Sequence, residues 1–225
     1  MPFFHAGSAP NAQGPRPGAL RAGLGLQPGM AVGLFGGSFN PAHDGHALVA
    51  ETAMRRLGLD RVVWLVSPQN PLKDTRDSAP LGERMASARA AAGLAASGPA
   101  MIVSDFESRA GTQWTIDTLR ALTARHPGVR FVWLMGSDNL ATFHRWRGWT
   151  DIMRTMPMAV ISRPGSLHHS RTAPAAARFA SARVPTSQAR LLPGMEAPAW
   201  TWLTATLNPR SSTALRAARD AAAHL

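Results

Sequence analysis

Short apolar runs alternate with longer segments of helical periodicity along most of the chain. Apolar runs of strand length occupy residues 31–35, 61–66, 100–104, 129–135 and 157–162. Between them, apolar residues recur at helical spacing over about residues 42–57, 80–96 and 112–124. Strands that alternate with helices form parallel sheets with right-handed crossover connections. The pattern therefore predicts an α/β fold built on an open parallel sheet.

Two stretches lack this pattern. Residues 1–29 are rich in Gly, Pro and Ala and have no periodic apolar positions, which predicts a disordered N-terminal extension. Met30 directly precedes the first strand, so a misassigned start codon is an open explanation for the extension. We expect that removing it leaves folding and activity nearly unchanged. Residues 164–190 carry few large apolar groups, which predicts a mobile insertion with at most a short helix.

The rest of the chain, residues 30–225, is expected to form a single domain. Its last elements are predicted to be an edge strand at residues 200–206 and an amphipathic helix at residues 211–223. A chain of 225 residues that is 45% hydrophobic suits one such domain and supplies a sizeable core.

Composition narrows the class of protein further. No apolar run approaches the roughly 20 residues that span a bilayer. The chain has no cysteine, which excludes disulfides, cysteine-rich metal sites and a thiol nucleophile. A reducing cytoplasm is the expected location.

The net charge of +11 suits an anionic partner such as a nucleic acid, a membrane surface or a small molecule. Almost all of the positive charge is arginine, and Lys73 is the only lysine. No dense basic run with interleaved aromatic residues is present, so we expect neither nucleic acid nor a membrane as a partner. The sequence leaves the oligomeric state open.

The first predicted strand runs into a glycine-rich turn and a helix start that carries two histidines. Residues 36–46 read Gly-Gly-Ser-Phe-Asn-Pro-Ala-His-Asp-Gly-His. Open parallel sheets bind ligands at the carboxyl ends of their strands, where loops meet helix N-termini. Gly36 and Gly37 let the backbone approach a phosphate, and the helix start adds N–H groups and a positive dipole end. His43 and His46 share one side of the first turn and can donate hydrogen bonds to a triphosphate and to departing pyrophosphate.

Other sites fit parts of this motif. It is not a Walker loop, because no Gly-Lys-Ser/Thr follows, and the Gly-x-Gly-x-x-Gly dinucleotide fingerprint is absent. A glycine-rich turn with a surface histidine pair is the simplest alternative. A zinc site is a weaker one, because no further His or acidic pair follows at ligand spacing. We therefore assign no metal-ligating residue.

The combination of a strand, a glycine-rich turn and His43-x-Gly45-His46 resembles the nucleotidyltransferase superfamily. The resemblance implies a Rossmann-like open parallel sheet with helices on both faces, of the nucleotidyltransferase type. Three further segments, which with the first span nearly all of residues 31–220, resemble the bacterial nicotinate-nucleotide adenylyltransferase family. That family transfers an adenylyl group from ATP to nicotinate mononucleotide, giving nicotinate adenine dinucleotide and pyrophosphate in NAD biosynthesis.

The second segment suits a carboxylate, and the third carries a candidate ribose ligand and a platform for a pyridine ring. Thr112-Gln113-Trp114-Thr115-Ile116-Asp117-Thr118-Leu119 opens a helix, where hydroxyl and N–H groups suit a carboxylate. Trp114 stands where the family usually has tyrosine. Leu134–Leu140 and Phe143–Arg147 follow the fourth strand. There Asp138 can accept hydrogen bonds from ribose hydroxyls, and the resemblance places a ring-stacking tryptophan at Trp146. We expect Trp149 to be a core residue.

The fourth segment is Asn208-Pro209-Arg210-Ser211-Ser212-Thr213-Ala214-Leu215-Arg216, where the family has Ile-Ser-Ser-Thr-x-Ile-Arg. Arg210 and Leu215 replace the two isoleucines, which leaves the strand before this site in doubt. Ser211 can cap the helix, and Arg216 can add charge-assisted bonds to phosphates. Lys73 can meet either phosphate group, but an incidental surface lysine fits equally, and the role of Arg84 is open in the same way.

The resemblance thus implies a full set of site residues. The catalytic residues are His43, His46 and Arg216. The ATP-binding residues are Gly36, Gly37, Ser38, Phe39, His43, His46, Gly136, Asp138, Ser211, Ser212, Thr213 and Arg216. The residues that bind the mononucleotide are Asn40, Lys73, Thr115, Ile116, Trp146 and Arg147.

The implied reaction needs neither a general base nor an acidic cluster. A mononucleotide phosphate is already ionised at neutral pH and can attack the α-phosphorus of ATP in line. Catalysis then comes from holding the phosphates together and neutralising their charge. Mg²⁺ is expected to arrive with ATP, because it keeps its waters and needs few protein ligands.

Other functions remain open at this stage. Related enzymes that use nicotinamide mononucleotide or phosphopantetheine as the acceptor are the nearest alternatives. A basic nucleic-acid-binding module is the alternative from another class, and it would show salt-sensitive affinity for nucleic acid instead of pyrophosphate release.

Overall fold

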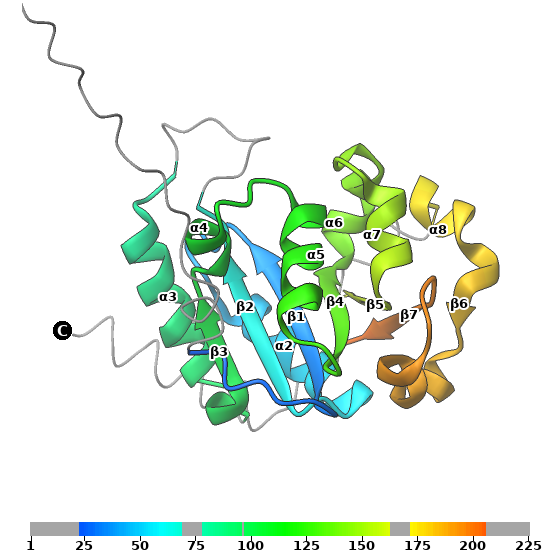
Figure 1. Ribbon diagram of the computed structural model, residues 1–225, viewed down its shortest axis with the longest axis horizontal. Helices are drawn as coiled ribbons and strands as arrows, with labels where there is room; N and C mark the ends of the chain where they lie inside the picture. The colour runs from blue at the N-terminus through cyan, green and yellow to red at the C-terminus, as the bar shows by residue number, and fades with distance from the viewer. Residues whose placement is uncertain (1–22, 69–77, 96, 163–171, 206–225) are drawn as a thin grey trace, which may run out of the picture.

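The chain folds around a seven-stranded parallel sheet in the order β3-β2-β1-β4-β5-β7-β6 (Figure 1). The computed structural model describes residues 23–68, 78–95, 97–162 and 172–205. The strands are β1 Ala31–Gly37, β2 Arg61–Val66, β3 Met101–Ser104, β4 Arg130–Gly136, β5 Met158–Ser162, β6 Arg183–Val184 and β7 Trp200–Thr204. The α/β fold and its open parallel sheet are therefore confirmed.

Helices cover both faces of the sheet in Figure 1, where α5 lies in front of the strands and α2 behind them. The α-helices are α2 Asp44–Leu57, α3 Leu81–Gly93, α4 Phe106–Ala110, α5 Thr115–Arg125, α6 Ser137–Thr142, α7 Trp149–Thr155 and α8 Pro174–Arg178. Short 3₁₀ helices are η2 Gly98–Ala100, η3 Phe143–Arg145, η4 Ala180–Ala182 and η5 Thr186–Gly194. Helix boundaries differ from the sequence prediction by a few residues.

The core has two layers because side chains of each strand alternate between the two faces of the sheet. In β1, Ala31 and Phe35 face the layer formed with α2, α3 and η5. Val32 and Leu34 face the layer formed with α4, α5, η3 and α7. Both layers are closed by buried side chains, so the central strands have no solvent-exposed face.

Strand order fixes where a ligand can bind. After β1 the chain builds β2 and β3 on one side, and it then returns to add β4 on the other side of β1. In such sheets the connections leave the two strands in opposite directions, and ligands bind at the carboxyl ends beside this switch point. The loop after β1 and the loop after β4 are therefore neighbours at the edge where a substrate is expected.

Residues 164–190 were predicted to form a mobile insertion with at most a short helix, but residues 172–190 are folded into several elements. This part contains α8, η4, β6 and most of η5. Small residues, alanines above all, fill its contacts with the core, which explains why a search for large apolar groups missed it. Hydrogen bonds from Trp200 Nε1 to the Phe179 carbonyl (2.7 Å) and from Thr201 Oγ1 to the Val184 carbonyl (3.0 Å) tie it to β7.

The prediction that β7 is an edge strand is wrong. β7 pairs with β5 on one side and with the two-residue β6 on the other, so β6 forms that edge of the sheet. The predicted final helix at residues 211–223 lies outside the described residues. Among the residues that are described, no helix combines the length and apolar character of a membrane span.

The end of the predicted N-terminal extension packs against the rest of the chain. The side chain of Leu24 is 1% exposed and joins the layer that contains Phe131. Gly29 donates from its backbone N–H to the Gly128 carbonyl (2.8 Å), and Arg130 Nη2 donates to the Gly29 carbonyl (2.9 Å). Residues 23–29 therefore belong to the packed structure, contrary to the prediction of disorder. One leucine among glycines gives no periodic pattern, although it fills a space in the core.

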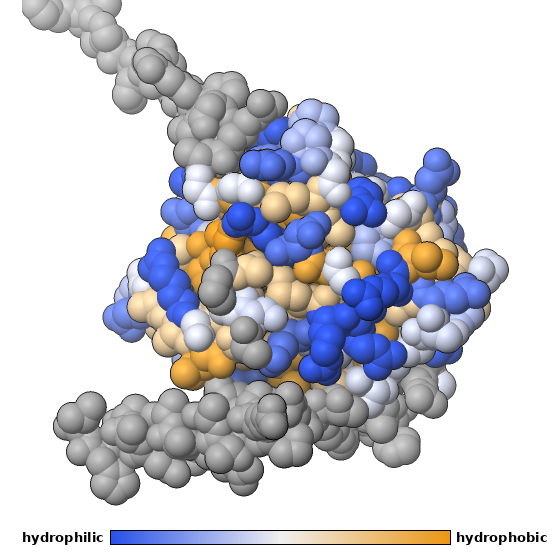
Figure 2. Space-filling model, turned by 90° about the horizontal axis from the view of Figure 1, so that it is seen from below, coloured by the Kyte–Doolittle hydropathy of each residue, from blue (hydrophilic) through white to orange (hydrophobic). Residues whose placement is uncertain are grey.

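The face seen from below in Figure 2 carries its hydrophilic residues in separate clusters, with hydrophobic residues between them. It is viewed at a right angle to Figure 1, from the side away from the arrowheads of β1 and β2. On this face, hydrophilic side chains form no continuous band.

We expect Leu24→Ala to lower the free energy of unfolding by about 2–5 kcal/mol, because it leaves a cavity in the core. Gln27→Ala is the matched control, since Gln27 is exposed in the same segment and should change stability by less than about 0.5 kcal/mol. Chemical denaturation of both variants measures the difference. Equal stability of the two variants would show that residues 23–29 do not contribute to the core.

Candidate active site

Four helices follow the strands β1 to β4 and begin near the edge of the sheet where these strands end. Helix α2 follows β1, α3 follows β2, α5 follows β3 through the short α4, and α6 follows β4 directly. Unpaired N–H groups and the positive ends of helix dipoles gather at such an edge. The arrangement suits anionic ligands.

The two glycines that end β1 make room for aromatic rings. A Cβ atom on Gly36 would collide with Cη2 of Trp133, which is on the neighbouring strand β4. A Cβ atom on Gly37 would lie 3.1 Å from the ring of Phe39. The sequence interpretation gave these glycines a role toward phosphate. The structure shows that close packing on the protein side already requires Gly36 and leaves little room for a side chain at Gly37.

Phe39 anchors the loop between β1 and α2. Its ring is 1% exposed, stacks on Trp64 with 5.1 Å between ring centroids and meets Phe35 edge to face at 5.5 Å. Its backbone has a φ of 47°, which is in the left-handed region that residues other than glycine rarely adopt. Burial of this ring thus holds the backbone in a conformation that it would not adopt alone.

His43 and His46 cap helix α2 reciprocally. His43 is the N-cap residue, and its Nδ1 accepts a hydrogen bond from the Gly45 N–H at 3.0 Å. Nδ1 of His46 accepts from the His43 N–H at 3.2 Å, which completes a capping box. Because each Nδ1 is an acceptor, the proton of each neutral ring lies on Nε2. The ring centroids are 3.9 Å apart, which confirms that the two histidines share one side of the helix start.

The loop after β4 brings a carboxylate to the same edge. Gly136 ends the strand and is the N-cap residue of α6. A Cβ atom on Gly136 would lie 2.5 Å from Oδ1 of Asp138, so the carboxyl group folds back over this glycine. Asp138 is exposed, whereas Ser137 between them is buried. Gly136 is therefore required for the position of the Asp138 carboxylate.

Helix α5 begins at Thr115, later than the predicted start at Thr112. Trp114 is its N-cap residue and makes no side-chain capping bond. Thr112 lies before the helix and bonds through its hydroxyl to the hydroxyl of Thr118 at 2.8 Å. The first turn of α5 thus begins at Thr115 and Ile116, which are the two residues that the resemblance assigns to substrate binding.

Residues 146–148 pack against this helix start. The Arg147 guanidinium carbon lies 5.2 Å from the ring centroid of Trp114, within the range of a cation–π interaction. The Cβ position of Gly148 would lie 3.4 Å from Cγ2 of Ile116. The structure therefore brings together the second and third sequence segments, which are far apart in the chain.

Trp146 and Trp149 are both partly buried and both meet Phe143 edge to face, at 5.4 and 6.1 Å between centroids. Trp149 also meets Phe179 at 5.9 Å, which agrees with its expected place at the core. The partial exposure of Trp146 leaves part of its side chain accessible to a ligand.

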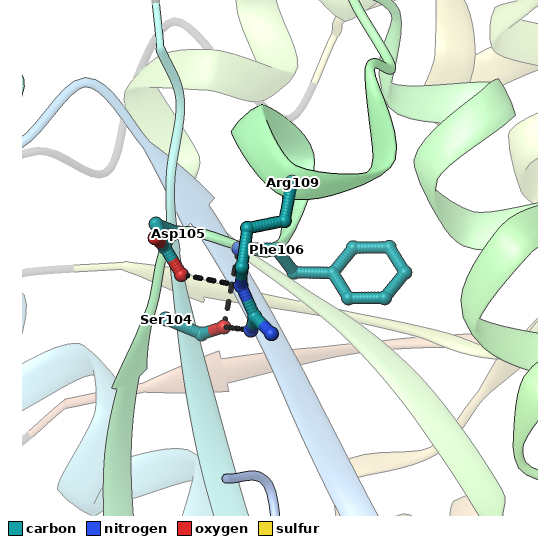
Figure 3. Close-up of polar contacts among 4 residues, drawn as sticks. All are labelled: Ser104, Asp105, Phe106 and Arg109. Atoms are coloured by element: carbon teal, nitrogen blue, oxygen red, sulfur yellow. Dashed lines mark hydrogen bonds and ion pairs between the residues drawn. The ribbon is translucent and has the colours of Figure 1, made fainter. Parts of the chain in front are cut away.

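A side-chain cluster at the end of β3 supports the approach to α5 (Figure 3). Ser104 Oγ accepts from the Phe106 N–H at 3.2 Å and from Arg109 Nη2 at 3.4 Å. Arg109 Nε also donates to Asp105 Oδ1 at 2.8 Å. These bonds hold the five-residue helix α4, which connects β3 to the start of α5.

Glu107 on α4 is a buried carboxyl group close to the same helix start. Its carbonyl accepts from the Thr112 N–H at 3.1 Å, and its side chain hydrogen-bonds to Thr118. Desolvation by burial raises the pKa of Glu107 to about 7, although the bond to Thr118 acts in the opposite direction. Glu107 is not among the residues expected from the sequence, where its nearness to the Thr112–Leu119 segment was the available signal.

The sequence analysis also left Arg84 undecided. It is 2% exposed, and its donors meet backbone carbonyl oxygens, so it does not face a substrate. A signal was present in the sequence, because Arg84 shares a helical face with Leu81 and Ala88. A charged residue on the apolar face of a helix is rarely buried unless polar groups pair with it.

Several expected site residues lie outside the described residues. These are Lys73, Ser211, Ser212, Thr213 and Arg216. Their assigned roles stay predictions.

Comparison with known proteins identifies the family to which the chain belongs. The sheet order, the glycine-rich loop and the histidine-capped helix define an α/β protein of the nucleotidyltransferase type, and a family model described as cytidylyltransferase-like matches residues 34–218. The chain is 65% identical over 187 residues to "Probable nicotinate-nucleotide adenylyltransferase" of Caulobacter sp. (strain K31), covering 83% of this chain and 97% of the relative. A relative of the same name from Rhizobium meliloti (strain 1021) is 53% identical over 191 residues, covering 85% and 100%. The chain belongs to the nicotinate-nucleotide adenylyltransferase family.

Solved structures show the same fold. Plasmodium falciparum nicotinic acid mononucleotide adenylyltransferase complexed with NaAD matches with a TM-score of 0.58 and 14% identity, covering 84% of this chain and 82% of that chain. The same enzyme complexed with APC matches with a TM-score of 0.57 and 13% identity, covering 85% and 83%. At this identity the similarity concerns the fold alone.

We expect Gly36→Ala to destabilise the protein by about 1–3 kcal/mol, because the new methyl group collides with Trp133 and forces a rearrangement. Gly82→Ala is the control, since its Cβ would meet nothing within 4 Å at the exposed start of α3. That change should leave stability equal or raise it by up to about 1 kcal/mol. Denaturant unfolding compares the two. A fully stable Gly36→Ala variant would contradict the close contact with Trp133.

The raised pKa of Glu107 makes stability depend on pH. Between its ordinary value of 4.5 and about 7, the folded protein holds a proton that the unfolded chain has lost. The free energy of unfolding therefore falls as pH rises through this window, by about 3 kcal/mol in total. Glu107→Gln should remove the decline, whereas Asp117→Asn, at an exposed carboxyl on α5, should retain it. Unfolding measured from pH 4.5 to 8 tests this, and an unchanged slope in Glu107→Gln would contradict it.

Proposed function

We propose that this protein transfers the adenylyl group of ATP to nicotinate mononucleotide, giving nicotinate adenine dinucleotide and pyrophosphate, as a step in NAD biosynthesis. The observation that carries the proposal is that two helix starts with different chemistry lie at one edge of the sheet. One is capped by two histidines, and the other lies beside an arginine stacked on tryptophan. Membership of the family selects the substrates that fit them.

The start of α5 suits the carboxylate of the acceptor. Its backbone N–H groups and its dipole favour an anion, and Thr115 adds a hydroxyl. The Arg147 guanidinium, held over Trp114, places a positive charge close by. Trp146 supplies the aromatic surface for the pyridine ring. A nicotinate ring carries the carboxylate that this arrangement favours, whereas the amide analogue is uncharged.

The start of α2 suits the phosphates of ATP. Since Nδ1 of both rings is occupied, Nε2 of His43 and of His46 is the atom that donates to phosphate oxygens. Ser38 and Phe39 contribute the backbone of the loop, and Gly36 and Gly37 allow its close packing.

The remaining assignments complete the two binding regions. Asp138 is placed at the ATP ribose and Gly136 beneath it, while Asn40 belongs to the acceptor side. The proposed phosphate ligands from the end of the chain are Ser211, Ser212, Thr213 and Arg216, and Lys73 is the proposed partner of the mononucleotide phosphate.

The reaction is a single displacement. A phosphate oxygen of nicotinate mononucleotide forms a bond to the α-phosphorus of ATP, the bond from that phosphorus to the β-phosphate bridging oxygen breaks, and pyrophosphate leaves with the electron pair. The nucleophile is already anionic, so no residue needs to remove a proton. The protein contributes orientation of the two substrates and neutralisation of charge on the departing group.

Mg²⁺ fits this arrangement as a companion of ATP. Among the described residues, no group of three or more His, Cys, Asp or Glu side chains could hold a metal ion. Mg²⁺ keeps most of its waters and binds through phosphate oxygens, so it needs few protein ligands. When bound, Mg²⁺ would neutralise phosphate charge.

Because the reaction consumes ATP and the chain has no cysteine, we place the protein in the cytoplasm.

We expect His46→Gln to lower kcat by about 10²–10³ while affinity for the mononucleotide changes little, as loss of a donor to developing charge does elsewhere. Glutamine can keep the capping bond to the His43 N–H, so helix α2 should stay formed. His46→Ala removes the cap as well and should also lower the melting temperature. Steady-state kinetics and thermal unfolding separate the two effects. Turnover equal to wild type in a folded His46→Gln would reject the role of His46.

We expect wild-type kcat/KM to favour nicotinate over nicotinamide mononucleotide by roughly tenfold to over a hundredfold, the value of one charge-assisted hydrogen bond. Pyrophosphate release with saturating ATP measures it. Trp146→Ala should weaken both substrates equally, whereas Arg147→Gln and Thr115→Ala should narrow the gap. Arg145 is an exposed arginine of the same segment, and Arg145→Gln is the control that should preserve the preference for nicotinate mononucleotide. An amide preference would reject nicotinate as substrate but not adenylyl transfer, and activity only with phosphopantetheine would identify another member of the superfamily.

A further inference from the structure

We propose that Arg84 is a positioning residue that shapes the loop at residues 36–46 for ATP without touching the nucleotide. The expected changes in kcat and KM rest on the proposed function. The structural basis of the inference is independent of that function, because it concerns how helix α3 holds the loop.

The guanidinium of Arg84 connects three separate pieces of backbone. Nη1 donates to the carbonyl oxygens of Ser38 (2.8 Å) and Ser67 (2.7 Å), and Nη2 donates to that of Pro68 (2.7 Å). Nε donates to the Ala79 carbonyl at 2.9 Å. The loop after β1, the end of β2 and the start of α3 thus meet at one planar cation. Lysine cannot reproduce this geometry, since its ammonium group is a single point of charge.

Arg84 is buried without an ion-pair partner among the described residues. Its side chain is 2% exposed, and no carboxylate lies within ion-pair distance in that part of the chain. Desolvation lowers its pKa, although an arginine remains charged at neutral pH. A buried charge is costly unless it is hydrogen-bonded, and here carbonyl dipoles supply those bonds. Among the described residues, carbonyl dipoles and no carboxylate therefore face its positive charge beneath the loop.

The bond to Ser38 sets the direction of a peptide group. In a trans peptide the C=O and the following N–H point in opposite directions. Because the Ser38 carbonyl points toward α3, the N–H of Phe39 points away from that helix. The Phe39 carbonyl also faces α3, where it lies 3.5 Å from Oγ of Ser87, whose hydroxyl makes its shorter bond, 3.0 Å, to the Arg84 carbonyl. Successive N–H groups on one side of a loop form an anion-binding concavity.

Two further bonds close the contact between α3 and the loop. Ser87 Oγ accepts from the Ala42 N–H at 3.2 Å, and Asn40 Oδ1 accepts from the Ala79 N–H at 3.2 Å. Helix α3 therefore holds the loop from residue 38 to residue 42. This explains how the strained backbone of Phe39 persists, since several contacts determine it together.

The test compares Arg84→Met and Arg84→Lys with two control variants on the same helix. Met85→Ala removes a buried neighbour that does not bond to the loop, and Arg89→Met removes an exposed charge. We measure the melting temperature, kcat, KM for both substrates, and affinity for the α,β-methylene analogue of ATP by calorimetry. Ser87→Ala is a milder variant that tests the same contact if Arg84→Met does not fold.

Arg84→Met should lower kcat by about a hundredfold and weaken binding of the ATP analogue, because a misplacement of about 1 Å can cost that much. KM for the mononucleotide should change less than threefold. Arg84→Lys should recover little of the loss, and Ser87→Ala should lose less than Arg84→Met in the same direction. Met85→Ala should lower the melting temperature while keeping kcat, and Arg89→Met should behave like wild type.

Two results would overturn the proposal. One is a folded Arg84→Met or Arg84→Lys with kcat and analogue affinity within twofold of wild type. The other is a loss of kcat in Met85→Ala that matches Arg84→Met at equal loss of melting temperature. If wild type releases no pyrophosphate with nicotinate mononucleotide, the proposed function fails instead, and the analogue affinities still decide the role of Arg84.

Discussion

The contact between the backbone of Gly36 and the indole of Trp133 is the constraint on which the rest of the site depends. It joins the carboxyl end of β1 to the middle of the neighbouring strand β4, with no space for a side chain between them. From there the chain must turn, and burial of Phe39 fixes that turn. The position of the histidine-capped helix follows, since its N-cap residue His43 lies four residues after Phe39. The glycine-rich sequence thus reflects packing inside the protein as much as access for a ligand.

The two helix starts proposed for substrate binding are each supported from behind by a buried polar side chain. Arg84 holds the loop before α2 through carbonyl oxygens. Glu107 supports the start of α5 through Thr118. One of these groups is cationic and lies on the side proposed for ATP, while the other is an acid with a raised pKa. Because Glu107 is neutral at pH values below its raised pKa, neither supporting side chain then places a negative charge near an anionic substrate.

Much of the fold could be predicted from the sequence because it depends on periodicity. The strands at residues 61–66 and 101–104 and the pairing of His43 with His46 follow from spacing along the chain. Packing by small residues leaves no such trace, which is why residues 172–190 were misjudged, and the single Leu24 among glycines leaves none either. Arg84 acts through carbonyl oxygens of other elements. Trp133 packs against a glycine of another strand, where the absence of a Cβ atom makes room for its ring. No pattern within one segment records such contacts.

The ends of the sheet have a consequence for behaviour at high concentration. One edge is the two-residue β6 and the other is the four-residue β3. A long edge strand exposes a row of unpaired N–H and C=O groups that can recruit a strand from another molecule. Among the described residues, each edge offers only a short row of this kind. The molecule should therefore resist aggregation through strand addition, even though its central strands are strongly hydrophobic.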